Sequence, residues 1–287
     1  MTIKRWILDS TLLLSPYSAT ARLDCEVLLA HVLDKDRVWL LAHPEHVLQG
    51  QSLKRVDRYL QRRKSQEPIA YIIGHSEFYG REFEVSADTL QPRPETETMV
   101  ELLLDTINSK QLSVHSIVDV GTGSSAIIIS AYMELLGKQY SVNDKQVSFY
   151  ATDISPAALE IARQNAKRYD ADIKFYQGDL LGPLLSTIYR LPSAIILANL
   201  PYVPDSHTIN QAAMHEPKHA IFGGPDGLDL YRTLFDQLTA INYQLSTILF
   251  TESLPPQHKE LARIAEQAGF KQIAEQDFIQ VFEFSSK

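Results

Sequence analysis

The chain has 287 residues, 45% of them hydrophobic, and a formal net charge of -8. This length is enough for two domains of about 100 to 200 residues each. Residues 1–64 hold 11 Lys and Arg against 7 Asp and Glu, a net charge of +4, which leaves -12 for the remainder. An acidic body argues against broad nucleic-acid binding, whereas the basic N-terminal part could either dock an acidic partner or simply solvate a helix end.

The sequence also limits the compartment in which the protein works. It has no apolar run near the roughly 18 residues needed to cross a membrane, and residues 1–10 lack the pattern of a signal peptide. The single cysteine, Cys25, has no partner for an internal disulfide, which suits a reducing compartment. We therefore expect a cytoplasmic protein in which Cys25 is a buried structural thiol.

Two kinds of structure are predicted before the main domain begins. A helical pattern fills residues 6–65, and strand-like alternation is missing there, so we expect residues 1–75 to form a small helical, partner-binding domain. Two aromatic-rich runs then flank Gly80 in the manner of a short hairpin. Residues 76–93 are accordingly predicted to be a hairpin linker.

The remaining residues, 94–287, are predicted to form an α/β domain. Two prolines in QPRPETE, residues 91–97, delay a helix until Pro94 can serve as its first residue. From Ser116 onward, apolar strands alternate with helices, which predicts a doubly wound, mainly parallel sheet. Ligands of such sheets bind at the C-terminal ends of the strands, so the chemistry is expected there.

The first strand end is VDVGTGSSA, residues 118–126. Gly121 and Gly123 allow the backbone to turn tightly and to approach a ligand. This loop alone would suit NAD, a nucleotide or S-adenosylmethionine, or a tight turn without a ligand. Asp119 favours S-adenosylmethionine, because a carboxylate repels a pyrophosphate but suits an ammonium and a sulfonium group.

The next two strand ends also carry acidic residues. Asp153 can accept hydrogen bonds from both ribose hydroxyls of an adenosine, or it can help to cap the following helix, which Ser155 begins. Asp179 can bind the adenine amino group, and Leu180 offers an apolar wall for the ring. Three acid-bearing strand ends in order indicate an adenosine-containing cofactor.

The fourth strand end is ANLPY, residues 198–202. Pro201 pushes Leu200 into an extended conformation, so the Leu200 carbonyl can point the same way as the side chain of Asn199. Two acceptors then converge on one substrate NH2 group, and Tyr202 supplies a flat face for stacking. This pattern predicts in-line methyl transfer to a planar amino or amide nitrogen, although an Asn-x-Pro turn can also simply end a strand.

Several segments together resemble one enzyme family. They are PRPETE, DVGTGSSAI, TDISPAALEIARQNA, NLPY and EPKHAIFGGPDGLDLYR, and the combination of PRPETE with GGPDGLDLYR is the specific one. The chain resembles the class I S-adenosylmethionine-dependent release factor glutamine N5-methyltransferases. The resemblance implies a seven-stranded methyltransferase sheet and N-terminal helices that help to hold a bacterial-type peptide chain release factor. It also implies that the tetrapeptide binds the glutamine of the Gly-Gly-Gln loop of that factor.

The strand ends and the resemblance together assign the site residues. We expect no metal ligands, and we assign cofactor-binding, substrate-binding and catalytic roles to the following positions. The cofactor S-adenosylmethionine is expected to contact Asp119, Gly121, Thr122, Gly123, Ser124, Ser125, Asp153, Ile154, Asp179, Leu180 and Asn199. The substrate is expected to contact Arg93, Asn199, Leu200, Pro201, Tyr202 and Glu216, of which Asn199, Leu200, Pro201 and Tyr202 are also the catalytic residues.

The sequence departs from the family pattern at several points. Leu200 stands where the family usually has proline, Ser125 where a third glycine is common, and Leu254 where glycine is usual. The segment KQYSVNDKQ, residues 138–146, lengthens a connection and is expected to be a surface insertion. The final DFIQVFEF lacks the family's Asp/Arg-rich turn, so we expect an altered sheet edge with the active site retained.

Other interpretations of the sequence make different predictions. HEPKH, residues 215–219, matches a zinc-protease pattern, but Pro217 would break the helix that such a site needs. An adenine-N6 methyltransferase acting on RNA or DNA shares the NLPY motif, yet it would need a strongly basic surface. A non-catalytic cofactor-binding module remains an alternative because of Leu200, and a dehydrogenase is disfavoured by Asp119. We expect a monomer whose partner is a release factor and which makes no direct contact with nucleic acid or membrane.

Overall fold

The computed structural model describes residues 1–110, 114–137, 147–188, 193–240 and 246–284. The chain forms two compact units, one of Met1–His75 with Ile209–His215 and the other of Ser76–Thr208 with Glu216–Lys287. The insertion expected at residues 138–146 lies outside the described residues. The division into a partner-binding domain, a hairpin linker and a methyltransferase domain stays a prediction.

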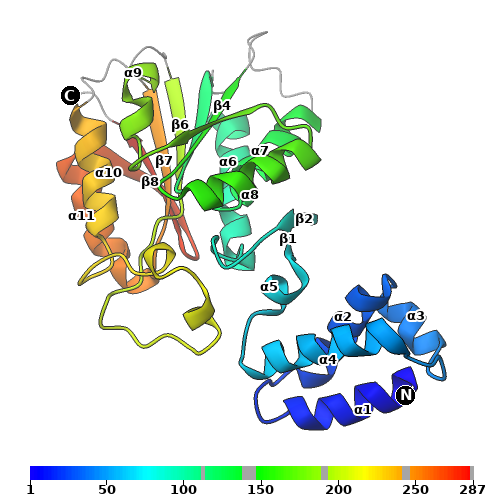
Figure 1. Ribbon diagram of the computed structural model, residues 1–287. Helices are drawn as coiled ribbons and strands as arrows, with labels where there is room; N and C mark the ends of the chain where they lie inside the picture. Colours follow the sequence, from blue (N-terminus) through cyan, green and yellow to red (C-terminus); the bar gives the residue numbers. More distant parts are fainter. Residues whose placement is uncertain (111–113, 138–146, 189–192, 241–245, 285–287) are drawn as a thin grey trace. The chain divides into compact units, whose positions relative to one another are not determined.

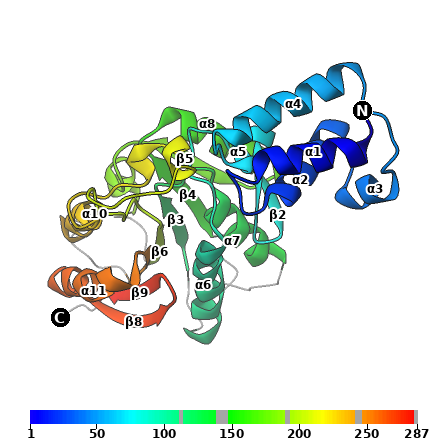
Figure 2. The same cartoon turned by 90° about the horizontal axis from the view of Figure 1, so that it is seen from below.

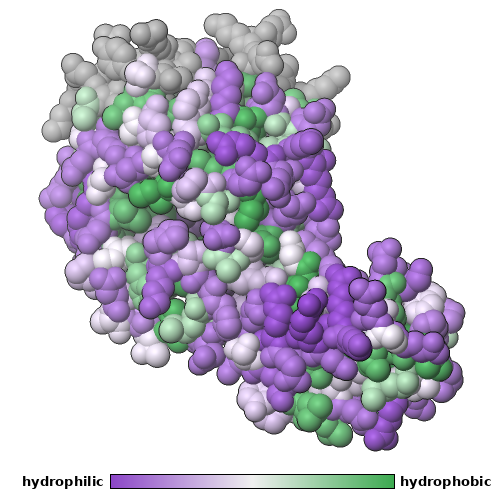
Figure 3. Space-filling model, viewed as in Figure 1, coloured by the Kyte–Doolittle hydropathy of each residue, from purple (hydrophilic) through white to green (hydrophobic). Residues whose placement is uncertain are grey.

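The first unit is helical. Its helices are α1 (Ile3–Leu14), α2 (Ala21–Leu33), α3 (Arg37–Ala42), α4 (Gly50–Lys64) and α5 (Ile69–Ile73). Their apolar faces enclose a core that includes Trp6, Leu28 and Leu60, and Cys25 is fully buried in it. Figure 3 shows hydrophilic side chains gathered over α4.

The basic run at the end of α4 has internal partners. Arg63 forms an ion pair with Asp24 at 2.7 Å, and Arg62 forms one with Glu67 at 2.5 Å. The ammonium group of Lys64 lies 5.8 Å from the centre of the Tyr17 ring. Arg62 and Arg63 therefore connect different segments of this unit, so their role is not limited to solvating the end of α4.

The second unit contains a seven-stranded sheet in the order β5-β4-β3-β6-β7-β9-β8. The strands are β3 (Ser116–Val120), β4 (Ser148–Asp153), β5 (Ile173–Gln177), β6 (Ser193–Ala198), β7 (Ser246–Glu252), β8 (Phe270–Gln276) and β9 (Ile279–Phe284). Strands β3 to β7 are parallel, and β9 is antiparallel to both β7 and β8. This arrangement confirms the expected mainly parallel seven-stranded sheet.

Helices cover both faces of the sheet, as Figures 1 and 2 show. Alternate strand residues point to opposite faces, so Ile195 and Leu197 belong to one core and Ile196 to the other. The first core also takes side chains from α6 (Glu97–Lys110), α7 (Ala126–Gly137) and α8 (Pro156–Arg168). The second takes them from α10 (Asp229–Ala240) and α11 (His258–Gln267).

Shorter elements complete this part of the chain. The expected hairpin consists of β1 (His75–Phe78) and β2 (Arg81–Glu84). The other short elements are η1 (Pro94–Thr96), η2 (Gly182–Leu184), α9 (Leu185–Ile188), η3 (Ala213–His215), η4 (Lys218–Ala220) and η5 (Pro255–Gln257). Pro94 begins η1, which leads directly into α6, as the sequence predicts.

The order of the strands brings the chemistry-bearing strand ends together. Val120, the last residue of β3, pairs with Thr152 of β4 on one side and with Ala198 of β6 on the other. The chain direction across the sheet reverses at β3, which leaves a crevice beyond the C-terminal ends of β3 and β6. Gly121 and Asn199 follow these ends directly and therefore lie at that crevice.

None of the helices in the described ranges combines the length and the apolar character that a bilayer crossing requires.

The buried side chain of Asn165 joins three segments of the second unit. Its Nδ2 donates to the carbonyl oxygens of Glu84, at 3.0 Å, and Ser124, at 2.9 Å. Its Oδ1 accepts from the backbone N–H of Glu84 at 2.7 Å. Because Asn165 is fully buried, water cannot replace these bonds, and α8 thereby holds both the hairpin and the glycine loop.

We predict that Asn165→Ala lowers the free energy of unfolding by about 1–3 kcal/mol, because it leaves buried backbone groups of Glu84 unsatisfied. The measurement is the urea midpoint followed by circular dichroism. Gln164→Ala on the exposed side of the same helix is the matched control and should change the midpoint little. Equal shifts for the two variants would contradict the role given to Asn165.

Candidate active site

A cavity of about 420 Å³ lies at the C-terminal ends of β3 to β6. Twelve of the residues that the sequence assigns to the site line it: Arg93, Gly121, Thr122, Gly123, Ser124, Asp153, Ile154, Asp179, Leu180, Asn199, Leu200 and Pro201. Four others are not among the residues that line it: Asp119, Ser125, Tyr202 and Glu216. The structure thus brings the four strand ends to one cavity.

The glycine loop is held in a conformation that few other residues adopt. Gly121 has φ +71°, and a Cβ atom there would lie 3.0 Å from Cδ2 of Leu200. Ser125 also has a positive φ, +63°, and its Oγ shares a hydrogen bond of 2.9 Å with Oγ1 of Thr122. Ser125 therefore takes the left-handed conformation that a third glycine would adopt easily, and a side-chain contact stabilises it.

Asp119 lies under this loop and is almost fully buried. Its Oδ2 accepts a hydrogen bond from Oγ1 of Thr122 at 2.6 Å, whereas Oδ1 has no hydrogen-bond partner among the described residues. Burial raises the pKa of Asp119 to about 7, and the negative charge of Asp153 adds to this effect. A cationic group bound nearby would stabilise the charged carboxylate.

The second and third strand ends present polar and apolar groups to the same cavity. Asp153 accepts hydrogen bonds from the backbone N–H of Gly123, at 2.9 Å, and of Ser155, at 2.8 Å. Each of its oxygens keeps a further lone pair that a ligand hydroxyl could use. Leu180 is buried at φ +49° and forms an apolar part of the wall beside Asp179.

Leu200 is held by its backbone as well as by its side chain. Its N–H, which proline would lack, donates to Oη of the buried Tyr231 at 3.3 Å. Its side chain is only 2% exposed and contacts the glycine loop at Gly121. Leucine in place of proline therefore fills the space beside Gly121, and its backbone N–H has a hydrogen-bond partner in Tyr231.

The GGPDG segment supports Pro201 and Tyr202 by close backbone approach. A Cβ atom at Gly223 would lie 2.1 Å from the carbonyl oxygen of Pro201, and one at Gly227 would lie 2.1 Å from that of Tyr202. Larger residues would displace the tetrapeptide, because these contacts are with backbone. This geometry explains why GGPDG and NLPY occur together in the sequence.

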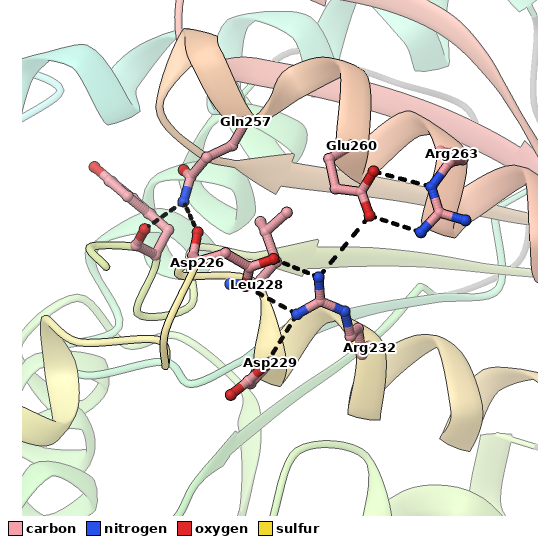
Figure 4. A network of polar contacts seen from close by, with 8 residues as sticks. Asp226, Leu228, Asp229, Arg232, Gln257, Glu260 and Arg263 are labelled. Carbon is pink, nitrogen blue, oxygen red and sulfur yellow. Dashed lines mark hydrogen bonds and ion pairs between the residues drawn. The ribbon is translucent and has the colours of Figure 1, made fainter. Parts of the chain in front are cut away.

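Gln257 connects the same backbone to the start of α11. Its Nε2 donates to the carbonyl oxygen of Asp226 at 2.8 Å (Figure 4) and to that of Tyr202 at 2.7 Å. Its Oε1 accepts from the N–H of Leu254 at 2.9 Å. Leu254 has φ -65°, an ordinary value for leucine, so this position does not require glycine.

An ion-pair network stabilises the turn before α10. Figure 4 shows the guanidinium group of Arg232 between Asp226, Asp229 and Glu260. The hydrogen bond from Arg232 lowers the pKa of Asp226 to about 2, so Asp226 carries its charge at neutral pH. The turn that carries Gly223 and Gly227 is thereby fixed at its C-terminal end.

Arg93 and Glu216 form an ion pair at the edge of the cavity. One nitrogen of Arg93 lies 2.6 and 2.8 Å from the two carboxylate oxygens of Glu216. Burial raises the pKa of Glu216, and the charge of Arg93 opposes that shift. The zinc-protease interpretation does not fit this segment, because Pro217 separates η3 from η4 and HEPKH forms no continuous helix.

Three residues at the site received no role from the sequence. Thr96 accepts a hydrogen bond from Nδ2 of Asn199 at 3.2 Å, and Glu252 accepts one from Oη of Tyr202 at 3.0 Å. Tyr231 donates to the carbonyl oxygen of Glu252 at 2.5 Å. Glu252 ends β7, so the rule that pointed to the other strand ends could have identified it as well.

Comparisons with known proteins agree with this geometry. A family model described as PrmC N-terminal domain matches residues 9–74, and one described as methyltransferase domain matches residues 113–218. A release factor glutamine methyltransferase of Bacillus anthracis is 34% identical over 230 residues, which cover 78% of this chain and 77% of that protein. The chain belongs to the release factor glutamine methyltransferase family. This confirms the resemblance, the methyltransferase activity and S-adenosylmethionine as the methyl donor.

Further members of the release factor glutamine methyltransferase family match over similar lengths. The protein of Coxiella burnetii is 33% identical over 263 residues, covering 91% of this chain and 89% of its own. That of Bacillus subtilis is 37% identical over 225 residues, covering 75% and 73%. Among solved structures, the hMettl16 catalytic domain in complex with a MAT2A 3'UTR hairpin is similar, with a TM-score of 0.52, 12% identity, and 82% and 80% of the two chains covered. The similarity to hMettl16 supports the fold alone.

The residues present suit the family's cofactor. The unpartnered Oδ1 of Asp119 is a buried acceptor that fits a cationic group, and the glycine loop leaves room where a Cβ atom would intrude. Asp153 retains lone pairs for hydroxyl groups, and Leu180 offers an apolar surface. The contacts of individual residues with the cofactor stay predictions.

We predict that Gly121→Ala weakens S-adenosylmethionine binding by roughly tenfold. The alanine backbone would be strained at positive φ, and its Cβ atom would crowd Cδ2 of Leu200. Isothermal titration calorimetry measures the Kd. Adding Leu200→Ala, which removes Cδ2, should restore part of the loss. The same addition should not rescue Gly123→Ala, since no atom lies within 4 Å of a Cβ atom there. Rescue of both glycine variants would refute the contact argument.

We also predict a pH dependence that comes from Asp119. Its pKa rises from an ordinary 3.8 to about 7 on folding, so its contribution to stability is present below about pH 4 and is lost as the pH rises through 7. Asp119→Asn has no such proton to lose. We compare the melting temperature of Asp119→Asn with that of the wild type, both without cofactor. The difference, variant minus wild type, should be higher at pH 8.5 than at pH 5.5 by about 2 °C or more. A constant difference would contradict the prediction.

Proposed function

We propose that the protein transfers a methyl group from S-adenosylmethionine to the side-chain amide nitrogen, N5, of the glutamine in the Gly-Gly-Gln loop of a peptide chain release factor. The observation that carries this proposal is the position of Asn199–Tyr202. This segment directly follows β6, next to the glycine loop, and Asn199 lines the same cavity as Gly121 and Asp153. Family membership supports the identity of the substrate.

In this mechanism the chain mainly positions the substrate. The cofactor supplies an electrophilic methyl group. Asn199 Oδ1 and the Leu200 carbonyl accept hydrogen bonds from the substrate NH2 group, which fixes the direction of its lone pair. Tyr202 contributes an aromatic face beside the amide. An amide nitrogen becomes acidic only as the new bond forms, so no strong base has to act before the attack.

Arg93 and Glu216 are proposed to border the substrate side of the cavity. Arg93 lines the cavity and is held by both oxygens of Glu216, whose side chain is buried. Two segments more than a hundred residues apart are thereby joined beside the cavity. This pair would keep the wall that contacts the substrate in place.

The helical unit is proposed to bind the release factor. Leu8, Leu12 and Leu13 of α1 are 54%, 68% and 53% exposed, and Leu8 and Leu12 share one helix face because they are four residues apart. An exposed apolar surface of this kind suits contact with another protein. We propose residues 1–75 as the partner-binding domain, 76–93 as a linker and 94–287 as the catalytic domain.

The negative net charge of residues 65–287 favours a protein substrate over RNA or DNA. Methylation of adenine N6 in RNA or DNA is therefore only the second candidate function. A non-catalytic module is disfavoured by the satisfied backbone of Leu200. We further propose a cytoplasmic monomer that makes no direct contact with nucleic acid, in keeping with a substrate that acts in translation.

We predict that the purified protein labels the Gly-Gly-Gln glutamine of a release factor when it is given S-adenosylmethionine with a labelled methyl group. Asn199→Ala should reduce kcat at least a hundredfold, an estimate of about 3 kcal/mol for lost positioning, with cofactor Kd changed only a few-fold. Mass spectrometry locates the label, and a structured RNA in the same mixture tests the second candidate. Label on the RNA alone would refute the proposed function.

A further inference from the structure

A buried carboxyl group lies behind the catalytic segment. Glu252 is the last residue of β7 and is completely buried. Its Oε1 accepts a hydrogen bond from Oη of Tyr202, whereas Oε2 has no partner within hydrogen-bonding distance among the described residues. Burial raises the pKa of Glu252 to about 7, while the side chains of Thr96, Tyr202 and Asn199 favour its charged form. Ala198 pairs with Thr251 across β6 and β7, so Asn199 and Glu252 directly follow paired residues of neighbouring strands.

Thr96 lies between this carboxylate and the catalytic asparagine. It is 2% exposed and ends η1. Its Oγ1 accepts a hydrogen bond from Nδ2 of Asn199 at 3.2 Å. The side chains of Thr96 and Asn199 both favour the charged form of Glu252, so the buried carboxylate in turn favours the NH2 end of the Asn199 amide on this side. Nδ2 of Asn199 is thus engaged by Thr96 close to a buried negative charge.

We propose that Thr96 and Glu252 are positioning residues that fix the side-chain amide of Asn199 with its oxygen available to the substrate. The two ends of an asparagine amide have almost the same shape, so sterics alone do not select between them. Here Nδ2 is engaged by Thr96, and Oδ1 is the end left for a ligand. This inference rests on the proposed function, because it concerns how the substrate NH2 group is received.

The orientation matters because the substrate group donates hydrogen bonds. With Oδ1 toward the cavity, Asn199 accepts from the substrate NH2 group. With the amide reversed, two NH2 groups would face each other, and both would lose a partner in a site from which water is excluded. The loss of one such bond corresponds to a decrease of roughly ten- to hundredfold in rate.

The Thr96→Val and Thr96→Ser variants test this inference as a matched pair. Valine keeps the shape of threonine but has no hydroxyl group, so Thr96→Val should lower kcat roughly ten- to hundredfold. Serine keeps the hydroxyl group and loses a methyl group, so Thr96→Ser should recover most of the lost rate. A role in packing alone predicts the opposite order, and that order would overturn the inference.

Glu252→Gln tests the effect of the carboxylate charge. Glutamine has nearly the same shape as glutamate but carries no negative charge, so it favours the NH2 end of Asn199 on its side less strongly. The variant should lower kcat with little change in the Kd of S-adenosylmethionine, since Glu252 does not line the cavity. An unchanged kcat in Glu252→Gln would overturn the inference.

A second readout does not depend on methyl transfer. In a 1H–15N spectrum, the side-chain NH2 signals of Asn199 are the pair that disappears in Asn199→Asp. They should shift in Thr96→Val and in Glu252→Gln and remain near their original positions in Thr96→Ser. If the wild type methylates no release factor but these shifts occur, the proposed function fails and the orientation of Asn199 stands. Unshifted signals in Thr96→Val would overturn the orientation whether or not the enzyme is active.

Discussion

The hydroxyl group of Tyr231 is the contact on which the geometry of the catalytic segment depends. It lies 3.1 Å from the carbonyl oxygen of Ala198 and 2.5 Å from that of Glu252, and it accepts the N–H of Leu200. One buried group thereby joins the ends of β6 and β7 to the tetrapeptide. Because Tyr231 belongs to α10, the helix that covers the sheet also sets the position of the residues that receive the substrate.

Most of the fold follows from patterns that are local in sequence. Alternating apolar strands and helices predict the parallel sheet, and Pro94, Ser155 and the glycine loop mark where helices begin. The strand ends predict the cavity wall for the same reason, since parallel strands bring their C-terminal residues to one edge. The attachment of Ile209–His215 to the helical unit has no such local signal, because it depends on long-range contacts such as that of His215 with the carbonyl of Ser65.

The supporting residues of the site were harder to predict for a related reason. Thr96 and Glu252 act on Asn199 and Tyr202 from segments far away in the sequence, and a buried threonine or glutamate carries no motif of its own. Glu252 ends β7, a strand end that carries none of the glycine, aspartate or Asn-x-Pro signals of the other four. Gly223 and Gly227 likewise have no chemical group of their own, and only their close approach to backbone oxygens makes them part of the site.

The contact between Leu200 and Gly121 has a consequence for how this sequence can change. A proline at position 200 would remove the N–H that Tyr231 accepts, and its shorter ring would leave a void beside Gly121. The residue that is usual in the family is thus no longer a neutral replacement in this chain. Leucine and proline are therefore not interchangeable at this position, because the leucine N–H has a buried partner and the leucine side chain fills space that proline would leave empty.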